Sequence, residues 1–297
     1  GRKYYMKNYK TLIIITAITS MLIMSCSNGG SSVNASTDST SETGGNDGSS
    51  TNVKSKILME LFTSTTCGPC LPQNTTLNRY LDPESSVYAG DLADDWILLR
   101  YHVWWPSAGD PYYDFNTNPV INREAYYDVG FVPHMYTNGS IDSGSTATTW
   151  RNDARSVVDG QTPIRIQISG ARDGYNLSGN ISFTSASDLS ALGLRFYVAV
   201  THDNSQYQAP NGQTIFDQTF IDFLTGDSSS GYYSFPLTIN KGETYNYNYN
   251  WTLDSNWPNN SNVSWSTEDL NIIAFVQFDN AGVNEKRIFQ VEALSFD

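Results

Sequence analysis

The sequence feature that most constrains the fold is a pair of cysteines in the tetrapeptide Cys67-Gly-Pro-Cys70. A mostly apolar run at 56–63 precedes the pair and is typical of a strand. The residues that follow, 71–81, predict a helix. This order puts Cys67 at a helix N-terminus, where the helix dipole and free N–H groups favour a thiolate.

An exposed thiolate in this position attacks a disulfide, and the second cysteine then resolves the mixed disulfide. A zinc site of four cysteines is excluded, because the chain has only 3 cysteines. A structural disulfide is the remaining alternative, although so short a loop stabilises a fold little. The pattern therefore favours a redox-active pair, with Cys67 as the nucleophile and Cys70 as the resolving thiol, and leaves a structural pair open.

Later segments predict the rest of an α/β thioredoxin-like domain over residues 54–159. We expect a buried strand at 96–104, helices at 119–129 and 147–158, and a strand that begins near residue 134. Thioredoxin folds place a cis-proline opposite the cysteine pair, and Val132-Pro133 lies at that point along the chain. A cis bond there exposes the backbone of Val132 to an extended substrate, so Pro133 is a candidate substrate-positioning residue.

Several ionisable side chains are candidates for tuning the cysteine pair. Glu60 lies on the strand before the pair, where it either moves the proton of Cys70 or faces solvent. His134 follows the expected cis-proline and His102 ends a neighbouring strand, so each either tunes the thiolate or only stabilises a loop. We expect His202 to be structural. We expect no metal site, because the three histidines are scattered and no carboxylates are paired at ligand spacing, and no nucleotide site, because the sequence has no Gly-rich phosphate loop.

Residues 160–297 predict an all-β antiparallel sandwich as a second domain. Apolar residues alternate with a period of two, and strands are expected at 164–168, 176–184, 194–200, 231–237, 243–253, 270–278 and 287–293. The aromatic stripe from Tyr245 to Trp251 is interpreted as half of the core, with a sugar- or peptide-binding face as the alternative. A long loop at 206–227 is expected to lie over the first domain.

Residues 1–53 predict export and tethering rather than folded structure. We expect residues 1–26 to be a lipoprotein signal peptide that starts at Met6, with residues 1–5 an artefact of the chain's start. The apolar run at 12–24 is too short for a transmembrane helix, which needs about 20 apolar residues. The run ends before Ser25-Cys26, which resembles the bacterial lipobox and implies cleavage before Cys26 and lipid attachment there. A plain secretory peptide and a signal anchor are the alternatives.

The residues after this expected cleavage point indicate a flexible leash. The stretch at 27–53 is almost entirely Ser, Gly, Thr, Asn and Asp, so it is expected to be a disordered linker. The chain as a whole has 17 basic against 30 acidic residues, a net charge of -13. This balance excludes a nucleic-acid partner, which needs clustered Lys and Arg.

The order of these motifs resembles a family of bacterial outer-membrane lipoproteins, the "outer-membrane protein twenty-eight" family. The segments that carry the resemblance are Glu60–Thr63, Cys67–Pro72, Tyr101-His102, Gly109–Tyr113, Arg123–Tyr127 and Val132–Gly139. The resemblance extends from residue 57 to the C-terminus, and it implies a thioredoxin-like half, a β-rich half and an outer-membrane location. Two positions depart from the usual thioredoxin pattern: Thr66 stands where Trp is usual, and His134 where Thr is usual.

Two functions follow from the sequence. The first is a lipid-anchored protein of the bacterial cell envelope that exchanges disulfides with protein dithiol or disulfide substrates, as a thiol–disulfide oxidoreductase. The alternative is a non-enzymatic surface lipoprotein that binds a protein or glycan through its sandwich and carries a vestigial cysteine pair.

Overall fold

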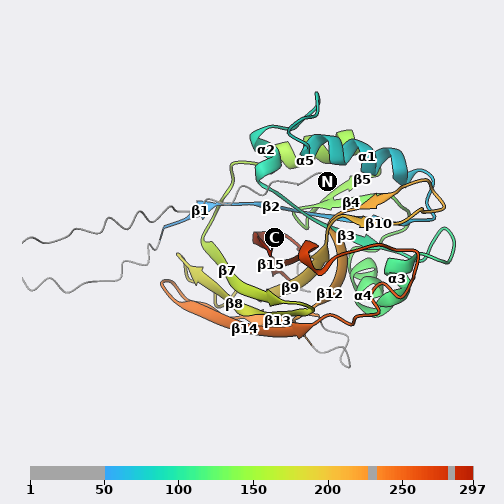
Figure 1. Ribbon diagram of the computed structural model, residues 1–297. Helices are drawn as coiled ribbons and strands as arrows, with labels where there is room; N and C mark the ends of the chain where they lie inside the picture. Colours follow the sequence, from blue (N-terminus) through green and yellow to red (C-terminus); the bar gives the residue numbers. More distant parts are fainter. Residues whose placement is uncertain (1–50, 227–232, 280–284, 297) are drawn as a thin grey trace, which may run out of the picture. The chain divides into compact units, whose positions relative to one another are not determined.

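The computed structural model describes residues 51–226, 233–279 and 285–296 of the chain (Figure 1). The predicted signal peptide, its Cys26 and residues 27–50 of the predicted linker lie outside the described residues. Val53, the last residue of that linker, pairs with Thr162 in a small two-stranded sheet. None of the helices among the described residues is long and apolar enough to cross a membrane.

The described part is mostly β-structure with few helices. Its strands are β1 (Val53–Lys54), β2 (Ile57–Thr63), β3 (Trp96–His102), β4 (His134–Thr137), β5 (Ile141–Gly144), β6 (Gln161–Thr162), β7 (Ile164–Asp173), β8 (Asn176–Ser185), β9 (Leu194–His202), β10 (Ser205–Gln206), β11 (Ile215–Phe216), β12 (Thr219–Phe223), β13 (Phe235–Leu237), β14 (Thr244–Thr252), β15 (Leu270–Phe278) and β16 (Ile288–Ser295). Its helices are α1 (Cys70–Leu81), α2 (Asp91–Asp94), α3 (Pro111–Phe115), α4 (Thr117–Tyr127) and α5 (Ala147–Val157), with a 3₁₀ turn at Thr267–Asp269.

Local capping explains where several helices begin and end. The side chain of Asp110 accepts hydrogen bonds from the first N–H groups of α3, and Pro111 occupies the first turn, where no intrahelical donor is needed. Thr146 caps α5 in the same way by accepting from the Thr149 N–H. Helix α4 ends at Tyr127, and the next residue, Asp128, adopts the left-handed conformation with φ of 55°. The short helices α2 and α3 were not expected from the sequence pattern.

One sheet runs through both halves of the chain. Its strand order is β16-β15-β9-β12-β3-β2-β4-β5, and β13 pairs with β9 (Figure 1). Strands β2 and β3 are parallel, whereas β4 and β5 are antiparallel to their neighbours. The halves join where β12 lies parallel to β3, with Thr219 opposite Arg100. The sequence predicted two domains, at 54–159 and 160–297, and this sheet runs across the boundary between them. Near Arg100 the second half pairs with the edge of β3, where β3 would otherwise present unpaired backbone groups.

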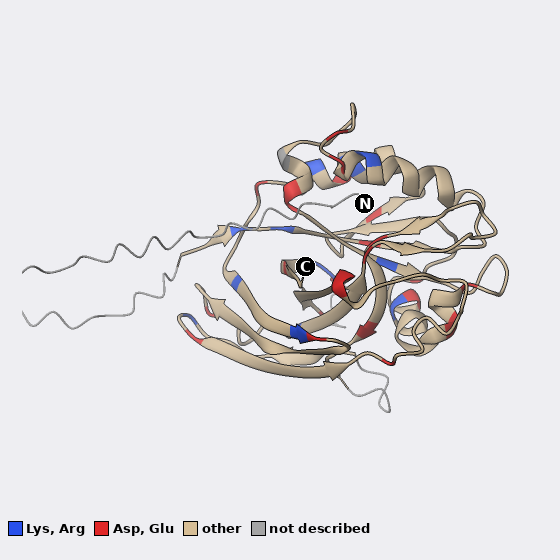
Figure 2. Cartoon of the chain, viewed as in Figure 1, with Lys and Arg blue, Asp and Glu red and all other residues tan. Residues whose placement is uncertain are grey.

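A second sheet of order β14-β8-β7 completes the sandwich predicted for residues 160–297. Apolar side chains of β7 and β8 pack against those of β9 and β15 in one continuous core that includes Ile181, Phe183, Val198 and Ile272. Of the aromatic stripe interpreted as half of the core, Tyr249 is buried in this core, Tyr247 and Trp251 pack against it partly buried, and Tyr245 is exposed. The alternating asparagines of β14 are exposed, and β8 and β14 carry no charged residue (Figure 2).

Helices cover both faces of the strands that precede residue 159. Helices α1 and α5 pack on one face, where Leu77 and Trp150 meet Met59 and Leu61 of β2. Helix α4 packs on the other face, and its core extends across the junction to Phe275 of β15. Side chains on successive positions of a strand point to opposite faces, so β2 serves both cores with one short run of residues.

Two buried carboxyl groups lie beside the junction of the halves. Asp203 accepts hydrogen bonds from the Gln218 N–H and, at 3.1 Å, from the side-chain amide of Asn271. Burial, together with repulsion from Asp217, raises the pKa of Asp203 to about 7, against the opposing charge of Arg100. Burial also raises the pKa of Asp217. Below about pH 7, Asp203 therefore keeps a proton that it would release in an unfolded chain.

The variant Asp217→Asn is expected to flatten the pH dependence of stability. In the unmodified protein the folded state keeps a proton on Asp203 between its ordinary pKa of 3.8 and about 7. The free energy of unfolding therefore falls as the pH rises through this window, by up to about 1.4 kcal/mol for each pH unit. Without the charge at residue 217, Asp203 ionises at lower pH and the fall is smaller. Urea unfolding across this window measures the two slopes, and equal slopes would contradict the assignment.

Candidate functional site

The cysteine pair lies where β2 leads into α1. Cys67 and Cys70 form a disulfide with an Sγ–Sγ distance of 2.06 Å, and Cys70 is the first residue of α1. The backbone N–H of Cys70 points at Cys67 Sγ across 3.1 Å. The predicted position of the pair at a helix N-terminus is confirmed. A negative charge on Cys67 Sγ would face both this donor and the positive end of the helix dipole.

Both sulfur-bearing residues are buried, which corrects the expectation of an exposed Cys67. Cys67 is 1% exposed and Cys70 is 0% exposed. The two residues between them, Gly68 and Pro69, are exposed. The carbonyl oxygen of Val132 lies 3.7 Å from Cys67 Sγ and contributes to its cover. A large partner therefore meets the Gly68-Pro69 turn first, and reaching the sulfur requires a local movement.

The peptide bond between Val132 and Pro133 is cis, as predicted. Pro133 precedes β4, which runs antiparallel to β2 with His134 opposite Phe62. This pairing returns the chain to the end of β2, where the cysteine loop begins. The backbone of residue 132 and the disulfide, which are distant in sequence, consequently lie side by side.

Glu60 fits neither of the two alternatives that the sequence left open, because its side chain does not face solvent and its hydrogen-bond partners are not the cysteines. Its buried carboxylate accepts two hydrogen bonds from the Arg123 guanidinium, at 2.7 and 2.8 Å. The hydroxyls of Tyr101 and Tyr127 donate to it at 3.0 and 2.5 Å. The physical reason is strand alternation: Glu60 points to the face that α4 covers, whereas α1 packs on the opposite face.

The histidine beside the cis-proline is also held by neighbours other than the cysteines. His134 donates from Nε2 to Asp142 at 2.7 Å, and its ring stacks on Phe131 with centroids 4.2 Å apart. Like Glu60, it points to the face of the sheet that α4 covers, because its neighbour Tyr136 belongs to that core. None of these contacts joins His134 to a cysteine, so they do not support the candidate role of His134 in tuning the thiolate.

Asp110 is a site residue that sequence reasoning missed. Its carboxylate is fully buried and accepts hydrogen bonds from His102 Nδ1 at 2.8 Å and from the Thr65 N–H at 2.7 Å. Burial alone would raise the pKa of Asp110, but the charge and hydrogen bond of His102, with the backbone donors, hold it below the ordinary value. Asp110 thus anchors the loop that carries Cys67. The signal in the sequence was only a helix cap, Asp before Pro.

A segment of the second half reaches the cysteine loop, as predicted for 206–227, although Ile215–Phe216 and Thr219–Phe223 of that range are strands and not loop. The side-chain amide of Asn211 donates to the carbonyl oxygens of Ser64 and Cys67, each at 3.1 Å. Its backbone N–H donates to the Thr65 carbonyl at 3.0 Å. Sequence analysis located the loop but gave no reason to single out Asn211.

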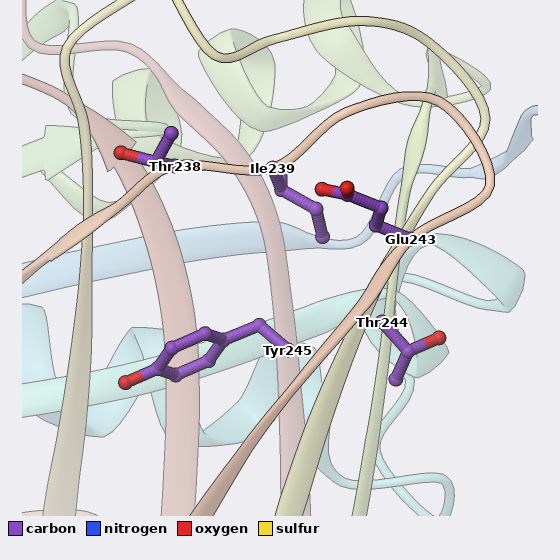
Figure 3. Close-up of a pocket in the computed structure, with 5 residues that line it drawn as sticks. All are labelled: Thr238, Ile239, Glu243, Thr244 and Tyr245. Carbon is purple, nitrogen blue, oxygen red and sulfur yellow. The ribbon is translucent and has the colours of Figure 1, made fainter.

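Other candidate positions belong to the fold. His202 is buried and donates to the Ser266 carbonyl at 2.8 Å, and burial lowers its pKa to about 4, so it is structural as expected. No group of three His, Cys, Asp or Glu residues in the described ranges is placed to hold a metal. A surface depression of about 300 Å³ lies beside the turn before β14 (Figure 3), and its lining residues are Thr238, Ile239, Glu243, Thr244 and Tyr245. None of these belongs to the cysteine loop.

Comparison with known protein families finds no match for the chain, and comparison with curated proteins finds no significant relative. Solved structures that are similar in fold include the following two. HBP35 of Porphyromonas gingivalis has 16% sequence identity and a TM-score of 0.65 over 82% of this chain and 76% of that chain. A protein of Agrobacterium tumefaciens has 13% identity and a TM-score of 0.50 over 82% of this chain and 96% of that chain. At identities this low the likeness concerns the fold alone.

The variant Glu60→Gln is expected to destabilise the protein by about 3 kcal/mol. It leaves the Arg123 guanidinium buried without its counter-charge, which is costly in a dry core. Urea unfolding measures the loss, with Glu84→Gln on the exposed surface as the matched control. Because Glu60 faces away from α1, the pKa of Cys70 in the reduced protein is expected to stay unchanged. A large shift of that pKa in a folded Glu60→Gln protein would restore the proton-carrier role.

Proposed function

We propose that residues 54–159 form a thioredoxin-like domain and that the protein carries out thiol–disulfide exchange through Cys67 and Cys70. The observation that carries this proposal is the position of the disulfide at the start of α1, with the Val132 carbonyl 3.7 Å from Cys67 Sγ. The strand order β3-β2-β4-β5, with helices on both faces, supports the assignment of the domain. The resemblance to the outer-membrane lipoprotein family adds the same expectation from the sequence.

The oxidised pair accepts two electrons from a substrate dithiol. A substrate thiolate attacks Cys67 Sγ, the bond between the cysteines breaks, and Cys70 leaves as a thiolate that takes a proton from solvent. A second thiolate of the substrate then attacks the substrate sulfur of the mixed disulfide. A substrate disulfide forms, and Cys67 leaves as a thiolate that faces the Cys70 N–H.

The reverse sequence reduces a substrate disulfide. The Cys67 thiolate attacks one substrate sulfur, and the other substrate sulfur leaves as a thiolate. Cys70 loses its proton to solvent and attacks Cys67 Sγ. This attack restores the disulfide between the two cysteines and releases the second substrate thiolate. A small dithiol then returns two electrons to the pair for the next turnover.

The backbone beside Pro133 provides the docking point for an extended substrate. In this proposal the substrate chain lies against residue 132, and backbone hydrogen bonds hold its sulfur in line with Cys67. Because Cys67 is 1% exposed, the Gly68-Pro69 turn and the backbone at 132 must separate before the sulfurs meet. The substrate class is a protein dithiol or disulfide in a flexible segment.

The variant Cys67→Ser is expected to lower disulfide exchange at least about 100-fold, because the attacking or attacked sulfur is removed. The assay follows reduction of a protein disulfide in the presence of a small dithiol. Cys70→Ser is expected to accumulate a mixed disulfide with the substrate, which mass spectrometry detects. Cys26→Ser is the matched control, since it removes a cysteine outside the pair. Unchanged turnover in Cys67→Ser would instead favour the partner-binding lipoprotein with a vestigial pair.

We also propose that Cys26 carries the lipid that anchors the protein in the bacterial outer membrane. The support is the sequence pattern, an apolar run that ends in Ser25-Cys26 before a Ser- and Gly-rich stretch. Growth with a labelled fatty acid is expected to label the protein and not the Cys26→Ser variant. A label that persists in the variant would contradict the anchor site while leaving the redox proposal intact.

A further inference from the structure

We propose that Asn211 is a positioning residue of the cysteine pair, through which the second half of the chain holds Cys67 in bonding position with Cys70. The inference rests on the proposed function for its biological meaning. Its physical content is an equilibrium between disulfide and dithiol, which can be measured whether or not the protein turns over a substrate.

One residue supplies donors to three carbonyl groups of the loop that leads to Cys67. The Asn211 side-chain amide bridges the carbonyl oxygens of Ser64 and Cys67, each at 3.1 Å. The Asn211 backbone N–H donates to the carbonyl of Thr65 at 3.0 Å. The Cys67 carbonyl also accepts the Cys70 N–H at 3.2 Å, so the amide of residue 211 acts on the turn that the disulfide closes.

The orientation of Asn211 is itself fixed. Its Oδ1 accepts the Gln213 N–H at 2.9 Å, which aims the amide nitrogen at the cysteine loop. Gln213 in turn accepts from the side chain of Asn74 in α1 at 3.0 Å. The Tyr112 and Ser205 hydroxyls are hydrogen-bonded at 2.8 Å, which ties the β10–β11 hairpin to the segment that follows β3.

The cysteine loop is held from a second direction at the same residue, Thr65. Asp110 accepts the Thr65 N–H at 2.7 Å, while Asn211 donates to the Thr65 carbonyl. Asp110 belongs to the first half of the chain and Asn211 to the second. The loop is therefore clamped between the two halves, and its shape depends on their being joined in one sheet.

A clamped loop favours the disulfide over the dithiol. When two thiols are held close together, their effective concentration rises and the bond between them is harder to reduce. Loss of the Asn211 amide would let Cys67 move away from Cys70 in the dithiol form. The disulfide is then expected to be reduced more easily, and the reduction potential of the pair to rise.

The test is the equilibrium of the full-length protein with dithiothreitol. Dithiothreitol gives two electrons to the pair, so two protein thiols appear and the reagent closes to a cyclic disulfide. In Asn211→Ala the equilibrium constant for reduction is expected to increase at least about fivefold, the effect of losing one hydrogen bond of ordinary net strength. The backbone donor to Thr65 is kept in this variant. An unchanged constant, or a change in the opposite direction, would overturn the proposal.

Two further variants separate positioning from a general loss of structure. Asn211→Asp keeps the size of the side chain and the acceptor for the Gln213 N–H but has no amide donor, so its constant is expected to change in the same direction as that of Asn211→Ala. Gln208→Ala, at an exposed position of the same loop, is the matched control and is expected to leave the constant unchanged. Equal constants for Asn211→Asp and the unmodified protein would overturn the proposal even if Asn211→Ala fails to fold.

The alkylation rate of reduced Cys67 gives a readout that a purely structural role would not move. The dependence of this rate on pH reports the pKa of the thiol. This pKa is expected to differ between Asn211→Ala and Gln208→Ala even if the two variants have the same free energy of unfolding. If Cys67→Ser retained full exchange activity but Asn211→Ala shifted the equilibrium, the proposed function would fail and the positioning role would stand. The converse result would leave exchange intact and remove Asn211 from it.

Discussion

The buried ion pair between Glu60 and Arg123 is the interaction on which the arrangement of sheet and helices depends. A lone buried charge is unfavourable by several kcal/mol, so the guanidinium must lie where the β2 carboxylate can reach it. The Arg123 guanidinium also lies over the rings of Tyr197 and Phe275, at 4.9 and 5.4 Å, which belong to β9 and β15. One charge pair thereby joins α4 to β2, and the same guanidinium contacts strands β9 and β15 of the second half.

The continuous sheet has a direct consequence for the cysteine site. Strand β12 pairs with both β3 and β9, so the hairpin β10–β11 emerges beside the end of β3. The cysteine loop begins at the matching end of β2, because β2 and β3 are parallel and in register from Ile57 to Thr63. Asn211 is within reach of Cys67 for this reason. The second half therefore contributes contacts to the cysteine loop itself and does not only lie beside it.

Sequence reasoning located the groups that depend on local pattern and missed those that depend on which face of the sheet they occupy. The cysteine pair and the cis-proline followed from motif order along the chain. Glu60 was a candidate for the cysteine site because its place on the strand before the pair did not show which face of the sheet its side chain occupies. Its partner Arg123 is 63 positions away, and no periodicity connects the two. Asp110 and Asn211 are polar loop residues, and only the folded chain shows that both hold Thr65.

The longer strands, helices α1, α4 and α5, and the position of the cysteine pair could be predicted from the sequence, because these follow from local hydrophobic pattern, capping and spacing. The short helices α2 and α3 and the strand β12 could not, because each is too short to carry a clear pattern. Tertiary structure alone decided that the two halves share one sheet, since the edge of β3 can be satisfied by any strand that reaches it. It also decided the burial of Cys67 and the clamp at Thr65. Both arise from segments far apart in sequence, whose meeting depends on packing and on hydrogen bonds that no local pattern encodes.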